Sequence, residues 1–154
     1  MIEAREEDIA AFWRRVREQL PDLTPEPPAA WAFGATTAHA DELLALVLAG
    51  VKTGTASSVR DYEASGEPLP AVDDLSVILD GSAVPRAVLR TVSIEIVPFD
   101  QVTPEHAHAE GEGDRTLTAW REIHERYWRA HSENPLGFDR DMPVVCERFE
   151  LLFP

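Results

Sequence analysis

The sequence predicts an α+β fold for this chain of 154 residues. Two stretches, residues 4–20 and 116–131, carry apolar side chains at helical spacing. Two others, residues 75–79 and 83–96, are rich in β-branched residues and flank a turn. Helices alternating with strands in a chain of this length favour one small sheet with helices packed around it.

The first predicted helix is amphipathic and ends at Pro21. Its apolar residues recur at helical spacing: Ile9, Phe12, Trp13, Val16 and Leu20. Residues 21–28 contain four prolines and predict a stiff linker. We therefore expect residues 1–29 to form a helix and a proline-rich linker that precede a domain at residues 30–154. The helix is expected to pack back on that domain, with binding of a partner as the alternative.

The next elements follow from local signals. After Trp31–Gly34, residues 38–49 form an apolar run that stops at Gly50, which is typical of a helix with a glycine cap. The following Thr- and Ser-rich residues predict a strand or an extended turn. Residues 60–74 contain Gly, Pro and Asp without a regular period and predict a loop.

The second half is expected to contribute a hairpin, two helices and a last strand. Asp80-Gly81 between the two β-branched runs is a strong hairpin signal, and Pro98 closes the second run. Thr103-Pro104-Glu105 is typical of a helix start and predicts a short helix over residues 103–110. A longer helix is expected over residues 116–131, and a strand over residues 142–153.

Bulk composition limits the possible functions. The net charge of −14 disfavours charge-driven wrapping of long nucleic acid but allows a pocket for one nucleotide or nucleoside. The single cysteine excludes an internal disulfide framework. No apolar run is long enough to cross a bilayer, and the acidic N-terminus is unlike a signal peptide. These features favour a cytoplasmic protein.

Lys52 and Thr55 form the first candidate site. A lysine can activate a threonine hydroxyl as a base. Two residues separate them, so an extended chain would point them to opposite faces, and a bend at Gly54 would be needed to bring them together. The structural alternative is that Lys52 complements the carbonyl end of the preceding helix.

The second candidate is the acidic loop Glu110-Gly111-Glu112-Gly113-Asp114-Arg115. An acid from this loop could orient Lys52 or transfer a proton to a leaving amine. It could equally bind a metal. The structural alternative is a helix start, since Asp114 or Thr116 is a good capping residue and upstream acids complement the helix dipole. Capping does not account for both Glu110 and Glu112.

Aromatic residues form the third candidate. Tyr62 and Trp120 lie near these motifs and could stack a base. Trp120 is also expected to pack in the core, because it shares a helix face with Leu117 and Ile123. On the same face, His124 is expected to be a hydrogen-bonded core histidine, and Cys146 a buried, inert thiol in a strand.

Taken together, these motifs resemble the ASCH domain family, which is related to the PUA superfamily of RNA-binding modules. The resemblance extends from about Trp31 to Phe153. Its carriers are Gly50-Val51-Lys52-Thr53-Gly54-Thr55, Gly66-Glu67-Pro68-Leu69-Pro70, Pro98-Phe99, the acidic loop with Thr116-Leu117 and Trp120-Arg121, and Pro143-Val144-Val145-Cys146-Glu147-Arg148-Phe149. The N-terminal helix and Phe33-Gly34 fit longer members, although Ala35 stands where members often carry an acid.

The resemblance implies a small PUA-like β-barrel with helices around a cleft that faces nucleic acid or a nucleoside. Smaller relatives are amidohydrolases that remove the acetyl group of N4-acetylcytidine with a lysine, a threonine and a glutamate. These match Lys52, Thr55 and Glu112, with Glu110 as the alternative acid because this chain has one extra residue before Thr116. Other members similar in length have been described as ribonucleases.

The sequence therefore predicts a nucleoside- or RNA-directed hydrolase. Thr55 would attack or position a water, Lys52 would act as base, and Glu112 would orient Lys52 or protonate the leaving group. Alternatives are a single-strand ribonuclease in which Lys52 stabilises phosphate charge, and a binding module without catalysis. Expected partners are a nucleoside, a nucleotide or short single-stranded RNA, and no metal or cofactor is expected. The candidate substrate-binding residues are Thr53, Arg60, Tyr62, Glu110, Arg115 and Trp120.

Overall fold

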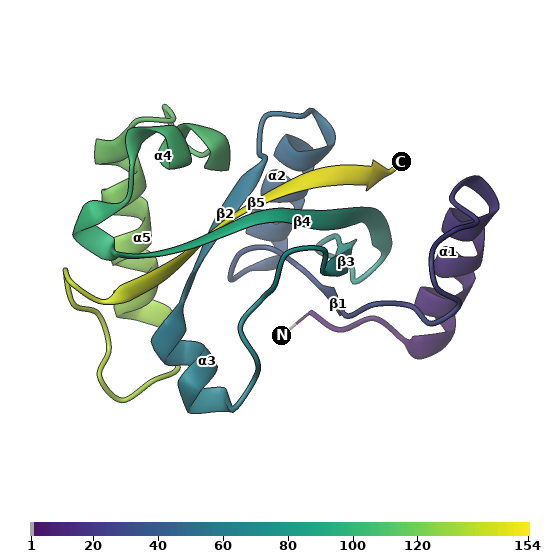
Figure 1. The fold of residues 1–154 in the computed structure, drawn as a ribbon, viewed down its shortest axis with the longest axis horizontal. Coiled ribbons are helices and arrows are strands. Elements are labelled where there is room, and N and C mark those ends of the chain that lie inside the picture. Colours follow the sequence, from purple (N-terminus) through teal and green to yellow (C-terminus); the bar gives the residue numbers. More distant parts are fainter. Residues whose placement is uncertain (1) are drawn as a thin grey trace. The chain divides into compact units, whose positions relative to one another are not determined.

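The computed structural model describes residues 2–154 and shows a mixed α+β protein (Figure 1). The helices are α1 (Glu6–Gln19), α2 (Thr37–Leu48), α3 (Val59–Ser65), the short 3-10 helix η1 (Phe99–Gln101), α4 (Pro104–Glu110) and α5 (Leu117–His131). The strands are β1 (Ala30–Trp31), β2 (Gly54–Ser58), β3 (Leu75–Leu79), β4 (Pro85–Pro98) and β5 (Pro143–Phe153). The α+β prediction is confirmed.

The strands form one five-stranded sheet in the order β1-β3-β4-β5-β2. β1 pairs with β3 in parallel, whereas the β3–β4 and β2–β5 pairs are antiparallel. In this order β1 and β2 are the edge strands, so closure of the sheet into a barrel is not confirmed. Figure 1 shows β4 and β5 as the two longest strands of the sheet.

The chain divides into two compact units. The first contains the residues up to Gly50, Asp73–Arg90 and Glu150–Pro154, and the second contains Val51–Val72 and Thr91–Phe149. β4 and β5 each pass from one unit into the other. The expected division between residues 1–29 and 30–154 stays a prediction.

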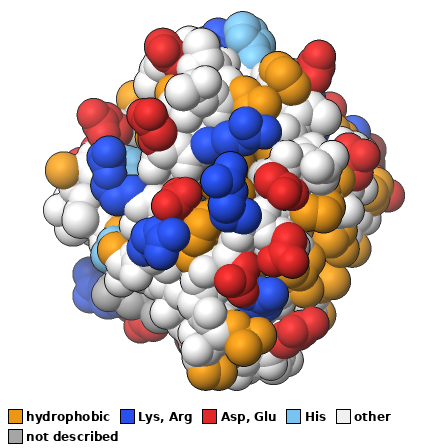
Figure 2. All heavy atoms as spheres, turned by 90° about the vertical axis from the view of Figure 1, so that its left-hand side faces the viewer, with side chains coloured by type: hydrophobic (Ala, Val, Ile, Leu, Met, Phe, Trp, Pro, Cys, Tyr) orange, Lys and Arg blue, Asp and Glu red, His pale blue; other side chains and the backbone are white. Residues whose placement is uncertain are grey.

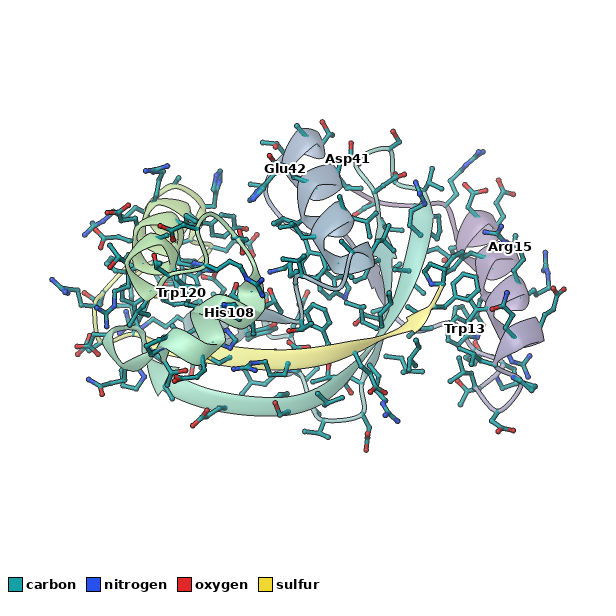
Figure 3. The ribbon with its side chains drawn as sticks, turned by 90° about the horizontal axis from the view of Figure 1, so that it is seen from above. Trp13, Arg15, Asp41, Glu42, His108 and Trp120 are labelled. Carbon is teal, nitrogen blue, oxygen red and sulfur yellow. The ribbon has the colours of Figure 1, made fainter. Side chains whose placement is uncertain are left out.

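In the first unit, the N-terminal helix packs on the sheet as expected. Its buried residues Phe12, Trp13 and Val16 share one hydrophobic cluster with residues of β3 and β4, namely Val77, Leu79 and Val88. Trp13 also donates from Nε1 to the carbonyl of Thr24 at 2.8 Å, which fixes the proline-rich segment to the helix. Figure 3 shows Trp13 and Arg15 on α1.

The hairpin predicted at Asp80-Gly81 joins β3 to β4. Asp80 Oδ1 accepts from the backbone N–H of Ser82 at 2.8 Å, and the Gly81 N–H donates to Asp41 of α2 at 2.7 Å. A Cβ atom at Gly81 would lie 2.3 Å from the carbonyl oxygen of Thr37, so only glycine fits there. Asp41 is labelled on α2 in Figure 3.

The second unit has its own aromatic core under α5. The buried residues Trp120, His124 and Trp128 recur every four positions and form one stripe of that helix. Phe99 lies against both tryptophans, with ring centroids 5.3 Å from Trp120 and 6.0 Å from Trp128. Each such aromatic pair contributes about 0.5–1.5 kcal/mol beyond the area it buries.

One α-helix was not predicted from the sequence. α3 lies in the segment that was predicted to be a loop, and it ends at Gly66 in the left-handed conformation, with φ +75°. Because α3 is one short helix with no buried residue, it leaves no apolar period in the sequence. No helix among residues 2–154 is long and apolar enough to cross a membrane.

Candidate functional site

Lys52 is the single lysine of the chain, and its side chain is buried, with 1% exposed. Its Nζ donates to the backbone carbonyl of Glu110 and to Glu112 Oε2, both at 3.3 Å. It also lies 3.7 Å from Glu110 Oε1. Burying an ammonium group costs several kcal/mol unless it is paired. The acidic loop supplies that pairing across more than fifty residues of sequence.

Glu110 is the centre of the cluster, and its side chain is 1% exposed. Its Oε2 lies 2.9 Å from His106 Nε2 and accepts a short hydrogen bond from Trp120 Nε1. Its Oε1 lies 3.1 Å from His124 Nε2 and faces Lys52. These donors come from α4, α5 and the segment before β2, so the carboxylate joins three parts of the second unit. Figure 3 shows α4 next to α5, with His108 and Trp120 labelled on them.

The partners of the two histidines define their protonation. His106 Nδ1 accepts from Arg148 Nε at 3.3 Å, so the ring proton is on Nε2 and points at Glu110. His124 Nδ1 lies 2.8 Å from the carbonyl oxygen of Trp120, which can only accept. Both nitrogens of His124 therefore face acceptors and donate, as an imidazolium does.

The pKa values of Glu110 and His124 shift in the directions that this arrangement requires. Burial acts to lower the pKa of His124, but the Glu110 carboxylate outweighs it and raises that pKa. Burial acts to raise the pKa of Glu110, but His124, His106 and Lys52 hold it well below its ordinary value. Both directions fit a Glu110 carboxylate that faces an imidazolium at His124.

Glu112 is the acid of this cluster that solvent can reach, with 14% of its side chain exposed. Gly111, between the two glutamates, ends α4 with φ +73°. A Cβ atom there would lie 2.9 Å from the carbonyl oxygen of Val51. This close approach of the loop to the residue before Lys52 brings both acids to the ammonium. The structure thus separates a buried Glu110 from a partly exposed Glu112.

Two further candidate residues, Thr53 and Arg115, donate hydrogen bonds to backbone carbonyls near Lys52 and the acidic loop. Thr53 donates to the carbonyl of Ala109 from its backbone N–H at 2.7 Å and from Oγ1 at 3.4 Å. Arg115 donates from Nε to the carbonyl of His108 at 3.0 Å and from Nη2 to that of Val51 at 3.3 Å. Both side chains thereby hold the acidic loop beside the Lys52 segment.

Thr55 lies in a regular part of β2. The β2–β5 register is continuous from Gly54 to Ser58, so the bend considered at Gly54 is not observed. Gly54 instead allows close packing, because a Cβ atom there would lie 3.0 Å from the carbonyl oxygen of Glu147 in β5, and it would point toward Ala109 of α4, whose Cβ would be 3.4 Å away. Strand alternation therefore points Thr55 away from the face that α4 covers. A shared role with Lys52 stays a prediction.

Arg60 and Tyr62 lie on α3 and have other partners. Arg60 Nη1 forms an ion pair with Asp139 Oδ2 at 2.7 Å. Tyr62 donates to Ser57 Oγ at 3.1 Å and lines a cavity of about 250 Å³ with Tyr127. Burial raises the pKa of Tyr62, so its hydroxyl stays protonated at neutral pH. Stacking of a base on Tyr62 stays a prediction.

Three potential metal ligands also meet in the cluster. Ligand atoms of Glu110, Glu112 and His124 lie within 4.8 Å of one another. Lys52 Nζ contacts both carboxylates, and both nitrogens of His124 already donate hydrogen bonds. A metal ion would therefore have to displace the ammonium and deprotonate the imidazolium.

His106 and Arg148 were missed as parts of this site. The sequence did hold a signal, since His106 and Glu110 are four residues apart on one helix, as are Trp120 and His124 on another. The structure buries Glu110 and Trp120 as deeply as Lys52, so neither of these two candidate binding residues lies on an exposed surface. Cys146 is buried as predicted, and burial is the main cause that raises its pKa to about 12.

Comparisons with known proteins place this chain in a family. The family model of the ASCH domain matches residues 29–152. A solved structure of protein EF3133 from Enterococcus faecalis V583, described under the family DUF984, is 34% identical, with a TM-score of 0.87 over 96% of this chain and 89% of that one. An ASCH domain from Lactobacillus crispatus JV V101 is 25% identical, with a TM-score of 0.84 over 97% of this chain and 96% of that one.

A more distant structure, hypothetical protein PH0355, shares the fold alone, with 15% identity and a TM-score of 0.52 over 80% of this chain and 98% of that one. No curated protein matches the sequence. The fold and the site define a mixed α+β domain with a buried lysine held by carboxylates. The chain belongs to the ASCH domain family.

Proposed function

We propose that the protein is a nucleoside- or RNA-directed hydrolase, and that its reaction is amide hydrolysis on an N4-acetylcytidine-like nucleoside. The observation that carries the proposal is the burial of the only lysine against a carboxylate that solvent can reach. Replacing a buried ion pair by apolar residues is often neutral or stabilising, so stability alone does not account for the Lys52 cluster. Buried, strongly interacting ionisable groups are typical of functional sites.

In the proposed reaction, water adds to the acyl carbon and the carbon–nitrogen bond breaks. Acetate leaves from one side and the free exocyclic amine of cytidine from the other. The Lys52 ammonium first passes a proton to Glu112, which lies 3.3 Å from Nζ. The neutral amine of Lys52 then takes the proton of the attacking group, and Glu112 orients Lys52 or protonates the leaving nitrogen. Glu110 holds Lys52 in place from behind. Thr55 would act as the nucleophile or would position the water. The family resemblance is the only support for that role.

The charge of the site favours this reaction over RNA cleavage. Glu112 lies 3.3 Å from Lys52 Nζ, so a phosphate approaching Lys52 would meet a carboxylate. A neutral acetylated base avoids that repulsion. Figure 2 shows the face that carries α4 and α5, where positive and negative side chains are interspersed and no continuous basic surface forms. Such a face suits a small ligand better than a long nucleic acid.

The experiment is incubation with a panel of acetylated nucleosides and a single-stranded RNA oligomer, with products identified by mass. We expect loss of the acetyl group from N4-acetylcytidine, and we expect Lys52→Ala to abolish it. Because Lys52→Ala leaves buried carboxylates unpaired, Glu112→Gln serves as a second variant at a partly exposed position. Removing a general acid or base typically slows turnover by about 10²–10⁴-fold.

If the wild-type protein leaves every acetylated nucleoside of the panel unchanged, that result would contradict deacetylation. Cleavage of the RNA oligomer that is lost in Lys52→Ala would instead establish a ribonuclease, and a ligand-induced rise in Tm without turnover would establish a binding module. A PUA-like relationship of the fold and a cytoplasmic location remain parts of this proposal.

A further inference from the structure

A second cavity, separate from the one beside Tyr62, lies on the side of His106 that faces away from Glu110. It has a volume of about 380 Å³ and is lined by residues of β4, β5 and α4, among them Ser93, Glu95, Thr103, His106 and Arg148. All of its lining residues belong to the second unit. None of the proposed catalytic residues lines it.

Arg148 is the only Lys or Arg among the residues that line this cavity, and its guanidinium group is only partly engaged. Its Nε donates to His106 Nδ1 at 3.3 Å. Within residues 2–154, its two terminal nitrogens have no hydrogen-bond or ion-pair partner. A half-buried guanidinium with free terminal donors is the group that proteins use to bind phosphate or carboxylate in a bidentate way.

Two of the other lining residues can donate hydrogen bonds to an oxyanion. Ser93 and Thr103 bring hydroxyl groups that can donate to its oxygens. Glu95 opposes an anion, but it is exposed, so water and salt screen its charge more than that of the half-buried Arg148. Cys146, also in the lining, adds no charge, because its raised pKa keeps the thiol protonated.

We propose that this cavity is a binding site for an oxyanion, of which a phosphate group is the best match, held by the terminal nitrogens of Arg148. The same arginine fixes the ring proton of His106 on the side that faces Glu110. A bound anion that draws Arg148 toward it would weaken its bond to His106. The site is therefore linked to the Lys52 cluster through one hydrogen-bonded ring.

The test is titration of the ¹⁵N-labelled full chain with inorganic phosphate, in a buffer without other oxyanions and at constant chloride. We expect saturable shifts at the amides of Ser93 and Thr103 and at the Nε–H of Arg148. Hydrogen bonds to charged groups contribute about 1.5–3 kcal/mol, so Arg148→Gln should weaken binding by about tenfold or more. Glu95→Gln should strengthen it by about two- to fivefold, as expected for an exposed charge.

The controls separate this site from the rest of the surface and from the proposed reaction. Arg129→Gln makes the same change of charge at an exposed arginine that pairs with Glu125, and it should leave binding unchanged. The titration uses no acetylated nucleoside and reads binding rather than turnover, so a failure of the hydrolase proposal does not affect this one. Parallel titrations with a nucleoside monophosphate and a short single-stranded RNA identify the source of the phosphate.

Two results would overturn the proposal. One is the absence of saturable shifts at Ser93, Thr103 and Arg148 with inorganic phosphate, the monophosphate and the RNA. The other is an affinity that neither Arg148→Gln nor Glu95→Gln changes. Because Glu95 is exposed, Glu95→Gln keeps the test decisive even if Arg148→Gln fails to fold.

Discussion

Glu110→Gln tests whether the buried carboxylate holds the cluster together. In the wild type, His106 and Trp120 donate to Oε2, and His124 and Lys52 face Oε1. A glutamine has one acceptor oxygen and one NH₂ group, so in either orientation its NH₂ faces two donors. The variant also leaves the charges of Lys52 and His124 buried with one carboxylate fewer.

The expected loss is large. Removing one partner of a buried ion pair costs about 3–5 kcal/mol. For a chain of this size each kcal/mol shifts Tm by about 2–4 °C, so the variant should melt roughly 6–20 °C lower. The assay is urea denaturation with thermal melting as a second probe. Glu112→Gln is the matched comparison and should cost less than Glu110→Gln, because 14% of the Glu112 side chain is exposed against 1% of the Glu110 side chain.

Glu110→Gln should also change how the free energy of unfolding depends on pH. His124 has a raised pKa when folded, so its contribution is complete below about pH 6.5 and is lost as pH rises through the raised value. Glu110 has a lowered pKa, so its contribution is complete above about pH 4.3 and is lost as pH falls through the lowered value. In Glu110→Gln both slopes should flatten. A variant that stays within 1 kcal/mol of the wild type and keeps its pH profile would refute the assigned role of Glu110.

Two further predictions concern the surroundings of the site. Gly111→Ala should destabilise the protein by more than Gly66→Ala, because both positions end a helix with positive φ but only at Gly111 would the new Cβ meet a backbone oxygen. The left-handed backbone alone costs about 1–2 kcal/mol in each, and equal losses in urea denaturation would contradict the close contact with Val51. Cys146 should resist alkylation in the native state, because a pKa of about 12 rather than 9.0 lowers the thiolate fraction roughly a thousandfold. Mass spectrometry of alkylated protein, native against unfolded in urea, measures this, and equal rates would show that the thiol is not buried.

Much of the fold could be predicted from the sequence because most elements have a period or a boundary residue. The stripe of Phe12, Trp13 and Val16 indicated α1, and Asp80-Gly81 indicated the turn between β3 and β4. α3 could not be predicted in this way, since a short helix without buried residues depends on its place at the end of β2 and not on its own pattern.

The site was predictable only in part. The local context of Lys52 and of the acidic loop marked both as candidates, and the structure joins them at 3.3 Å. The support from His106, His124 and Arg148 depends on how α4, α5 and β5 meet, which no local spacing encodes. For the same reason the sequence did not show that Glu110 is the buried acid and Glu112 the exposed one.

Glu112 and Glu110 hold Lys52 away from solvent, and we propose that Lys52 acts on a nucleoside from there. Because the chain has a single lysine, selective ¹⁵Nζ labelling gives one side-chain signal. We predict a signal whose protons exchange slowly with water, and which moves both in Glu112→Gln and on addition of N4-acetylcytidine. A rapidly exchanging signal that neither the substitution nor the nucleoside changes would contradict the claim.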